Sequence, residues 1–230
     1  MLLTLAQLSD IHFKEGRLLP PAASVARAIV AANPACKLCC IALTGDLAYS
    51  GSEAEYAELN AYFVLLRATL EEELANAQVV FIAIPGNHDC DHHRSTNTRR
   101  QLIEAPPASL AYVTPEDKIV ASCLEVQAGF LAFAHAVTEG IPYEPKDRLL
   151  HKRCFAVGDH RICFLLANTA WLSQLHDKQG SLFLPADLLK GASDSMETTS
   201  LTVLAMHHPT NWLAAETGRR HYSAHTKTRA

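Results

Sequence analysis

Residues 78–90 read QVVFIAIPGNHDC, and the change of character within this stretch decides the fold. An apolar run of strand length ends at a Pro-Gly pair and is followed at once by Asn87, His88 and Asp89. A short apolar run bounded by such a pair is typical of a buried strand, and the polar residues then stand at its carboxyl end. The stretch therefore predicts a core strand that leads directly into a functional loop.

The same pattern occurs twice upstream. Residues 2–8 and 37–43 are short apolar runs that suit buried strands. A helix is expected over 22–33, behind a Pro-Pro pair, and a longer amphipathic helix behind Ser52, where Glu55 gives the spacing of a capping box. Alternation of strands and helices predicts a parallel sheet with right-handed crossovers.

The second half of the chain predicts further strands of mixed direction. Helices are expected around 95–104 and 122–138. Residues 153–157 and 161–168 flank a Gly-Asp pair, which indicates an antiparallel hairpin, and 200–206 form one more apolar strand. The predicted fold class is α/β.

Composition limits the domain count and the classes of partner. The 230 residues contain no linker, repeat or low-complexity tract, so we expect one domain over 1–213 and an irregular basic tail over 214–230. The formal net charge of −4 gives no basic field, hence no strong nucleic-acid signal. We expect no membrane association, since no apolar run approaches the roughly 18 residues that a span needs and the N-terminus lacks a charged leader.

Cysteine usage predicts a reducing compartment. The seven cysteines are odd in number and lie mostly in apolar surroundings. Reduced, buried thiols and a cytoplasmic location are therefore expected. Cys36 and Cys39 have C-x-x-C spacing, but no second pair completes a structural zinc site.

Polar side chains follow each of the main predicted strands. They are Asp10 and His12, then Asp46, then Asn87, His88 and Asp89, and last His207 and His208. Because ligands bind beyond the carboxyl ends of strands in α/β sheets, we expect these groups to meet in one cleft. Carboxylate, amide and imidazole donors without thiolate suit Mn, Fe or Zn, and two such ions form a clamp for displacement at phosphorus. Gly45 and Gly86 would let the backbone approach closely there.

In combination these segments resemble the calcineurin-like metallophosphoesterase superfamily. The matching segments are LSDIHF, LTGDLAYSG, IPGNHDC and LAMHHP, spread over residues 8–209. The resemblance implies a four-layer αββα sandwich with two mixed β-sheets. It also implies a binuclear metal-dependent phosphoesterase that hydrolyses phosphomonoesters or phosphodiesters through a metal-bound hydroxide.

The resemblance assigns the metal ligands position by position. Asp10 and His12 would hold the first of two Mn, Fe or Zn ions, and Asp46 would bridge both. Asn87 and His207 would hold the second.

The remaining assignments concern catalysis and one open choice of register. His208 is the alternative to His207, because sequence does not fix the register by one residue. His88 would lie beside the phosphate-ester substrate and act on the leaving group, and Asp89 would orient its imidazole. Residues 91–93 are left over and predict a solvated loop.

The chain departs from the family pattern at its end. The last family motif, G-H-x-H, is missing, and His221 and His225 in the tail are four residues apart rather than two. We therefore expect a domain truncated at its C-terminus, with weaker metal binding. The tail reads as the end of a fragment, a truncated gene product or a frame-shifted segment.

Two other functions compete with hydrolysis. One is a truncated or degenerate non-catalytic module that binds metal or a partner; the phrases GDLAYSGSEAEY and HHPTNWL resemble domains that head larger signalling ATPases. The other, a nucleotide-binding regulator, lacks both a P-loop and a G-x-G-x-x-G motif.

Overall fold

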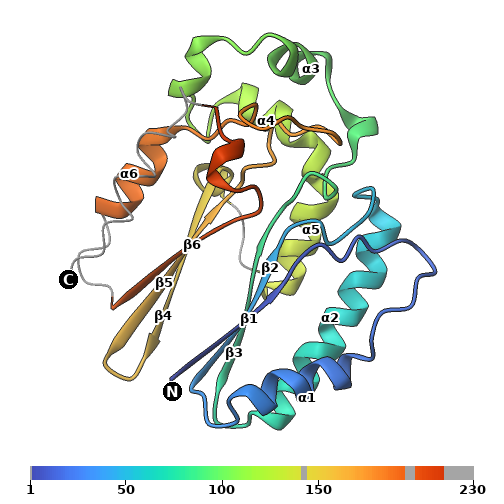
Figure 1. The fold of residues 1–230 in the computed structure, drawn as a ribbon, viewed down its shortest axis with the longest axis vertical. Coiled ribbons are helices and arrows are strands. Elements are labelled where there is room, and N and C mark those ends of the chain that lie inside the picture. The colour runs from blue at the N-terminus through green and yellow to red at the C-terminus, as the bar shows by residue number, and fades with distance from the viewer. Residues whose placement is uncertain (1, 141–143, 195–199, 215–230) are drawn as a thin grey trace.

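The fold is that of a computed structural model, which describes residues 2–140, 144–194 and 200–214. Two three-stranded sheets face each other, with helices on their outer sides (Figure 1). The main elements in chain order are β1 (Leu3–Leu8), α1 (Ala22–Ala32), β2 (Leu38–Thr44), α2 (Glu53–Glu73), β3 (Gln78–Ile84), α3 (Asn97–Glu104), α4 (Lys118–Cys123), α5 (Ala128–Val137), β4 (Leu150–Val157), β5 (His160–Ala167), α6 (Ala186–Asp194) and β6 (Leu201–Met206). The α/β class predicted from the sequence is confirmed.

The first sheet has the order β1-β2-β3 and both of its strand pairs are parallel. Every residue of β2 is buried, because its two faces serve two cores. Cys39, Ile41 and Leu43 pack in the cluster formed with α1, α2 and α5, while Cys40 and Ala42 pack against the second sheet. The three N-terminal strands and the crossover helices thus agree with the sequence prediction.

The second sheet has the order β4-β5-β6 and is mixed. β4 and β5 form the predicted antiparallel hairpin, and β5 pairs with β6 in parallel. Phe155, Phe164 and Leu166 face the first sheet, and Cys163 and Leu165 face the opposite way, into a core that includes residues of α4 and α6. Only this second sheet is mixed among the described residues, whereas two mixed sheets were expected.

The capping box predicted for the long helix is present. The Ser52 hydroxyl accepts a hydrogen bond from the Glu55 N–H at 3.3 Å, and the Glu55 carboxylate accepts one from the Ser52 N–H at 3.2 Å. These bonds satisfy backbone donors that the first helical turn leaves free. α2 therefore begins at a fixed point close to the loop that follows β2.

One apolar stretch was not anticipated. Lys118–Val137 is long and apolar enough to cross a membrane by length and composition, the single such helix in the described part of the chain. It comprises α4, a 3-10 turn over Leu124–Gln127 and α5, so the helix expected over 122–138 is interrupted. Phe130 and Phe133 are buried against α2, and a buried core helix passes the same test of length and composition.

The prediction of seven reduced cysteines is wrong for two of them. Cys154 and Cys163 are paired across β4 and β5 and form a disulfide, while the other five are free and buried. Disulfides are rare in reducing compartments. The cytoplasmic location thus stays a prediction that this bond does not support.

The packed part of the chain runs to its last described residue. The Ala214 N–H donates to the Leu182 carbonyl at 2.8 Å, and Ala214 is buried. The basic tail predicted from residue 214 onward otherwise lies outside the described residues.

Candidate metal centre

The loops after β1 and β2 run side by side at the carboxyl edge of the first sheet. The Asp10 N–H donates to the Gly45 carbonyl at 3.1 Å, and the His12 N–H donates to the Asp46 carbonyl at 2.9 Å. Asp10, His12 and Asp46 all have left-handed backbones, with φ of 55°, 46° and 53°. This conformation costs non-glycine residues on the order of 1–3 kcal/mol each and concentrates at functional sites. The strain marks these three residues as functional candidates.

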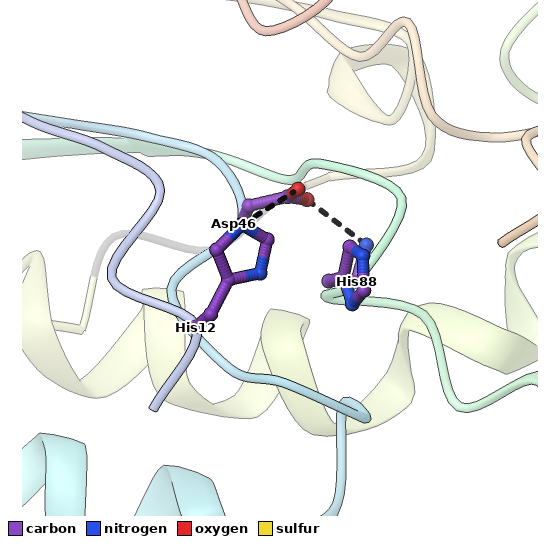
Figure 2. A group of neighbouring side chains, drawn as sticks. All are labelled: His12, Asp46 and His88. Carbon is purple, nitrogen blue, oxygen red and sulfur yellow. Dashed lines mark hydrogen bonds and ion pairs between the residues drawn. The ribbon is translucent and has the colours of Figure 1, made fainter. Parts of the chain in front are cut away.

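Asp46 lies at the centre of the cluster. Its Oδ2 is 3.8 Å from His12 Nε2, and its Oδ1 is 3.5 Å from His207 Nε2. Oδ1 also accepts a hydrogen bond from the His88 N–H at 2.9 Å. Figure 2 shows the Asp46 carboxylate between His12 and His88. The Asp46 side chain is 6% exposed and makes no ion pair with lysine or arginine among the described residues.

Two groups of donors share this carboxylate. One consists of His12, Asp46 and His88, and the other of Asp10, Asp46 and His207. Within each group the ligand atoms lie within 4.8 Å of one another, so each group could hold a metal ion. Shared membership is what a bridging Asp46 requires. Asp10 and His12, predicted to hold the same ion, fall in different groups here, and their shared role stays a prediction.

Two glycines make room for the cluster, as predicted. A Cβ on Gly45 would lie 2.5 Å from Nδ1 of His207, and a Cβ on Gly86 would lie 2.6 Å from the backbone nitrogen of Asp46. Real Cβ atoms do not approach other atoms so closely. Any other residue at either position would displace a candidate ligand.

Burial and charge act in opposite directions on the pKa values of Asp46 and His207. Burial raises the pKa of the Asp46 carboxyl, but the hydrogen bond and charge of His207 and the His88 N–H outweigh it, so the pKa is lowered overall. Burial likewise lowers the pKa of His207, but Asp46 outweighs it and the pKa is raised. Asp46 is therefore an anion at neutral pH. Nε2 is the His12 ring nitrogen that faces Asp46, while Nδ1 is buried without a hydrogen-bond partner in the described structure.

The hydrogen bonds of His207 and His208 favour His207 as the candidate ligand. Nδ1 of His207 donates to the Thr44 carbonyl at 2.9 Å, which leaves Nε2 facing Asp46. Nδ1 of His208 lies 2.9 Å from the Thr169 hydroxyl, and its Nε2 lies 3.3 Å from Oδ1 of Asn87. Burial lowers the pKa of His208 to about 4, so this imidazole is neutral. His207 is the candidate ligand, and His208 supports Asn87.

Asn87 lies on the wall of the same site. With Asp10 and His207 it lines a cavity of about 540 Å³. Its Nδ2 donates to the Leu175 carbonyl at 3.3 Å, and Oδ1 accepts from His208. The amide is thus held from both sides, and its predicted role as a ligand stays a prediction.

The role predicted for Asp89 is corrected. This carboxylate is fully buried and accepts hydrogen bonds from the N–H groups of Leu47 and Ala48 at 3.0 Å, from the Gly86 N–H at 2.9 Å and from the Tyr56 hydroxyl at 2.9 Å. Burial raises its pKa to about 6 although these donors lower it, so it is ionised at neutral pH. Asp89 joins the loops after β2 and β3 and does not orient the imidazole of His88.

His88 is oriented by a backbone carbonyl instead. Its Nδ1 lies 2.8 Å from the Tyr49 carbonyl, so Nδ1 carries a proton and donates. The ring packs edge-on against His12, with centroids 4.5 Å apart. His88 thus lies in one of the donor groups, and its predicted role beside the substrate stays a prediction.

Several residues near the site carried no signal that sequence reasoning could use. Leu175, His176 and Asp177 line the main cavity from a loop without a recognisable motif. His92, expected in a solvated loop, is half-buried, and its Nε2 lies 3.1 Å from the Asn87 carbonyl.

Comparison with protein-family models and with curated proteins found no match to this chain. The geometry of the site therefore carries the functional argument.

Proposed function

We propose that this chain is a binuclear metal-dependent phosphoesterase of the calcineurin-like class, built as a four-layer αββα sandwich. The observation that carries the proposal is the position of Asp46, whose carboxylate belongs to two separate His/Asp groups. A carboxylate shared in this way suits a pair of adjacent cations. The motif order in the sequence and the two facing sheets are compatible with the class.

The residues divide into ligands and a proton carrier. Asp10, Asp46 and His207 would hold one cation, and His12 with Asp46 would hold the other. Two divalent cations at such a site activate water and neutralise charge on the phosphoryl oxygens of a phosphomonoester or phosphodiester. The amide oxygen of Asn87 is a further donor on the cavity wall.

His88 is assigned to the leaving group. Because Nδ1 donates to the Tyr49 carbonyl, Nε2 is the atom that can exchange a proton with the substrate. General acid catalysis of this kind contributes about 10²–10⁴-fold to rate.

The experiment is hydrolysis of an aryl phosphate and an aryl phosphodiester with Mn²⁺. His88→Ala should keep bound metal but lose about 10²-fold or more in turnover, whereas Asp46→Ala should lose both metal and turnover. Asp91→Asn, on the adjacent 3-10 turn, serves as the matched control and should retain both. Full hydrolysis by Asp46→Ala would refute the proposal.

The second candidate is a metal-binding module without turnover. It is favoured by the small donor sets among the described residues: Asp10, Asp46 and His207 would supply one cation, and with His88 assigned to the substrate the other would keep His12 and Asp46. Stoichiometric metal together with no hydrolysis of either substrate would select this alternative.

A further inference from the structure

A second cavity adjoins the main one and belongs to neither donor group. It measures about 310 Å³ and is lined by residues of α3, the turn before it and the 174–175 loop. Leu175 lines both cavities, so the two are neighbours. The lining residues are His92, Ser95, Arg99, Arg100, Ile103, Glu104, Gln174 and Leu175.

The cavity contains a buried cation that lacks a counter-charge in contact. Arg99 is 1% exposed, and its one side-chain hydrogen bond in the described structure runs from Nη2 to the Ser173 carbonyl at 2.5 Å. Its Nε is buried without a partner. Asp177 acts on Arg99 through space, but the described residues form no ion pair with this guanidinium. A buried, unpaired guanidinium is costly, so it indicates a site for an anion.

The other polar groups agree with this charge. Arg100 follows on the same helix, is exposed and donates to the Ser95 carbonyl at 2.7 Å. Glu104 is the one acid among the lining residues, and it too is exposed. Arginine side chains bind phosphate and carboxylate in a planar, bidentate geometry.

The cavity is also connected to the candidate metal centre. His92 lines it and contacts the carbonyl of Asn87, the residue on the wall of the main cavity. A substrate that places a phosphoryl group at the metal centre could thus extend past Leu175 toward Arg99 and Arg100.

We propose that this second cavity binds a second oxyanion of the substrate. The substrate class is a phosphate ester that carries a further phosphate or carboxylate group. The inference rests on the proposed function for the identity of the ligand as substrate, but anion binding can be tested without turnover.

The first arm measures binding in EDTA, with pyrophosphate, inorganic phosphate and benzoate as probes, by calorimetry. Wild type should bind pyrophosphate, and Arg100→Gln should weaken it by about tenfold through loss of one charge-assisted contact. Arg99→Gln should weaken it similarly, and Glu104→Gln should strengthen it by removing a like charge. Arg27→Gln is the matched control, since Arg27 is exposed on α1 and contacts Ser24.

The second arm measures kcat/KM with Mn²⁺ for phenyl phosphate and for 4-carboxyphenyl phosphate. Wild type should prefer the carboxylated ester, the ratio of the two should fall toward one in Arg100→Gln, and Arg27→Gln should keep it. A phosphate ester that carries a second phosphate group is the comparison substrate. Preference for that ester over phenyl phosphate, with no preference for the carboxylated ester, would identify phosphate as the second group.

The two proposals fail in different ways. If the protein hydrolyses neither of the two esters, the proposed function is overturned. Pyrophosphate binding in EDTA still decides whether the subsite exists. Equal pyrophosphate affinity in wild type, Arg99→Gln and Arg100→Gln would overturn the subsite. Because Arg100 is exposed, its variant remains informative even where Arg99→Gln fails to fold.

Discussion

Replacing Asp89 by asparagine should destabilise the whole protein rather than the catalytic step. Oδ1 of Asp89 accepts from Leu47, Ala48 and Tyr56, and Oδ2 accepts from the Gly86 N–H. Asparagine keeps one acceptor oxygen, which can serve the three donors on Oδ1, and turns its NH₂ group toward the Gly86 N–H. One backbone N–H is then left buried and unsatisfied, which costs about 1–3 kcal/mol.

The remaining bonds weaken as well. They change from charge-assisted to neutral hydrogen bonds, which are roughly half as strong. Removal of a buried charge offsets part of this loss, because burial opposes ionisation of the carboxyl. The net loss of unfolding free energy should be about 2–4 kcal/mol.

Urea unfolding in EDTA, followed by circular dichroism, measures this loss. With a slope of about 2–3 kcal/mol/M, the midpoint should fall by about 1 M. Asp91→Asn is the control, since Asp91 accepts one hydrogen bond at an N-cap, where asparagine is equally good. A double-mutant cycle with Tyr56→Phe should give a coupling of about 1 kcal/mol.

A loss below about 0.5 kcal/mol, within the range of ordinary surface substitutions, would refute the reasoning. It would do so most clearly if Asp89→Asn instead altered the pH profile of hydrolysis, because that is the result expected of a residue that orients His88.

Three further predictions follow from the same geometry. Gly86→Ala should force Asp46 to move and lower Mn²⁺ affinity by tenfold or more, whereas Gly191→Ala, with nothing within 4 Å, should leave it unchanged; isothermal titration measures both. Mn²⁺ affinity should fall by up to about tenfold per pH unit as pH drops below the raised pKa of His207, because protons compete for its Nε2. In the metal-free protein the raised pKa of His207 contributes to the free energy of unfolding. This contribution is full below the pKa of the unfolded state and is lost as pH rises through the pKa of the folded state. The disulfide between β4 and β5 joins cysteines nine residues apart, and reducing it should lower the free energy of unfolding by about 2–3 kcal/mol, seen as a lower urea midpoint; reductant should have no effect on Cys154→Ser.

Much of the fold was predictable because its signals are local. Apolar runs of strand length identified all three parallel strands, and the capping box at Ser52 fixed the start of α2. The rule that ligands gather beyond strand ends brought Asp10 and Asp46 together correctly. The disulfide could also have been found, since the two-residue turn of the hairpin sets Cys154 opposite Cys163.

Other features depend on facts that a sequence does not contain. Successive residues after β6 point to opposite sides, so the choice of His207 over His208 needs the register of the sheet. The hydrogen-bond donors to Asp89 are backbone N–H groups of two loops, and only the folded chain brings these loops together. Arg99 lies in the helix predicted around 95–104, but nothing in that segment predicts burial of a cation.

Electron paramagnetic resonance of the Mn²⁺-loaded protein tests the central claim most directly. A carboxylate shared by both donor groups would hold two cations about 3.5–4 Å apart, so wild type should give the signal of a spin-coupled pair with two ions bound per chain. Asp46→Asn should lose the coupling. An uncoupled, single-ion signal from fully loaded wild type, or a coupled signal that survives in Asp46→Asn, would contradict the shared carboxylate.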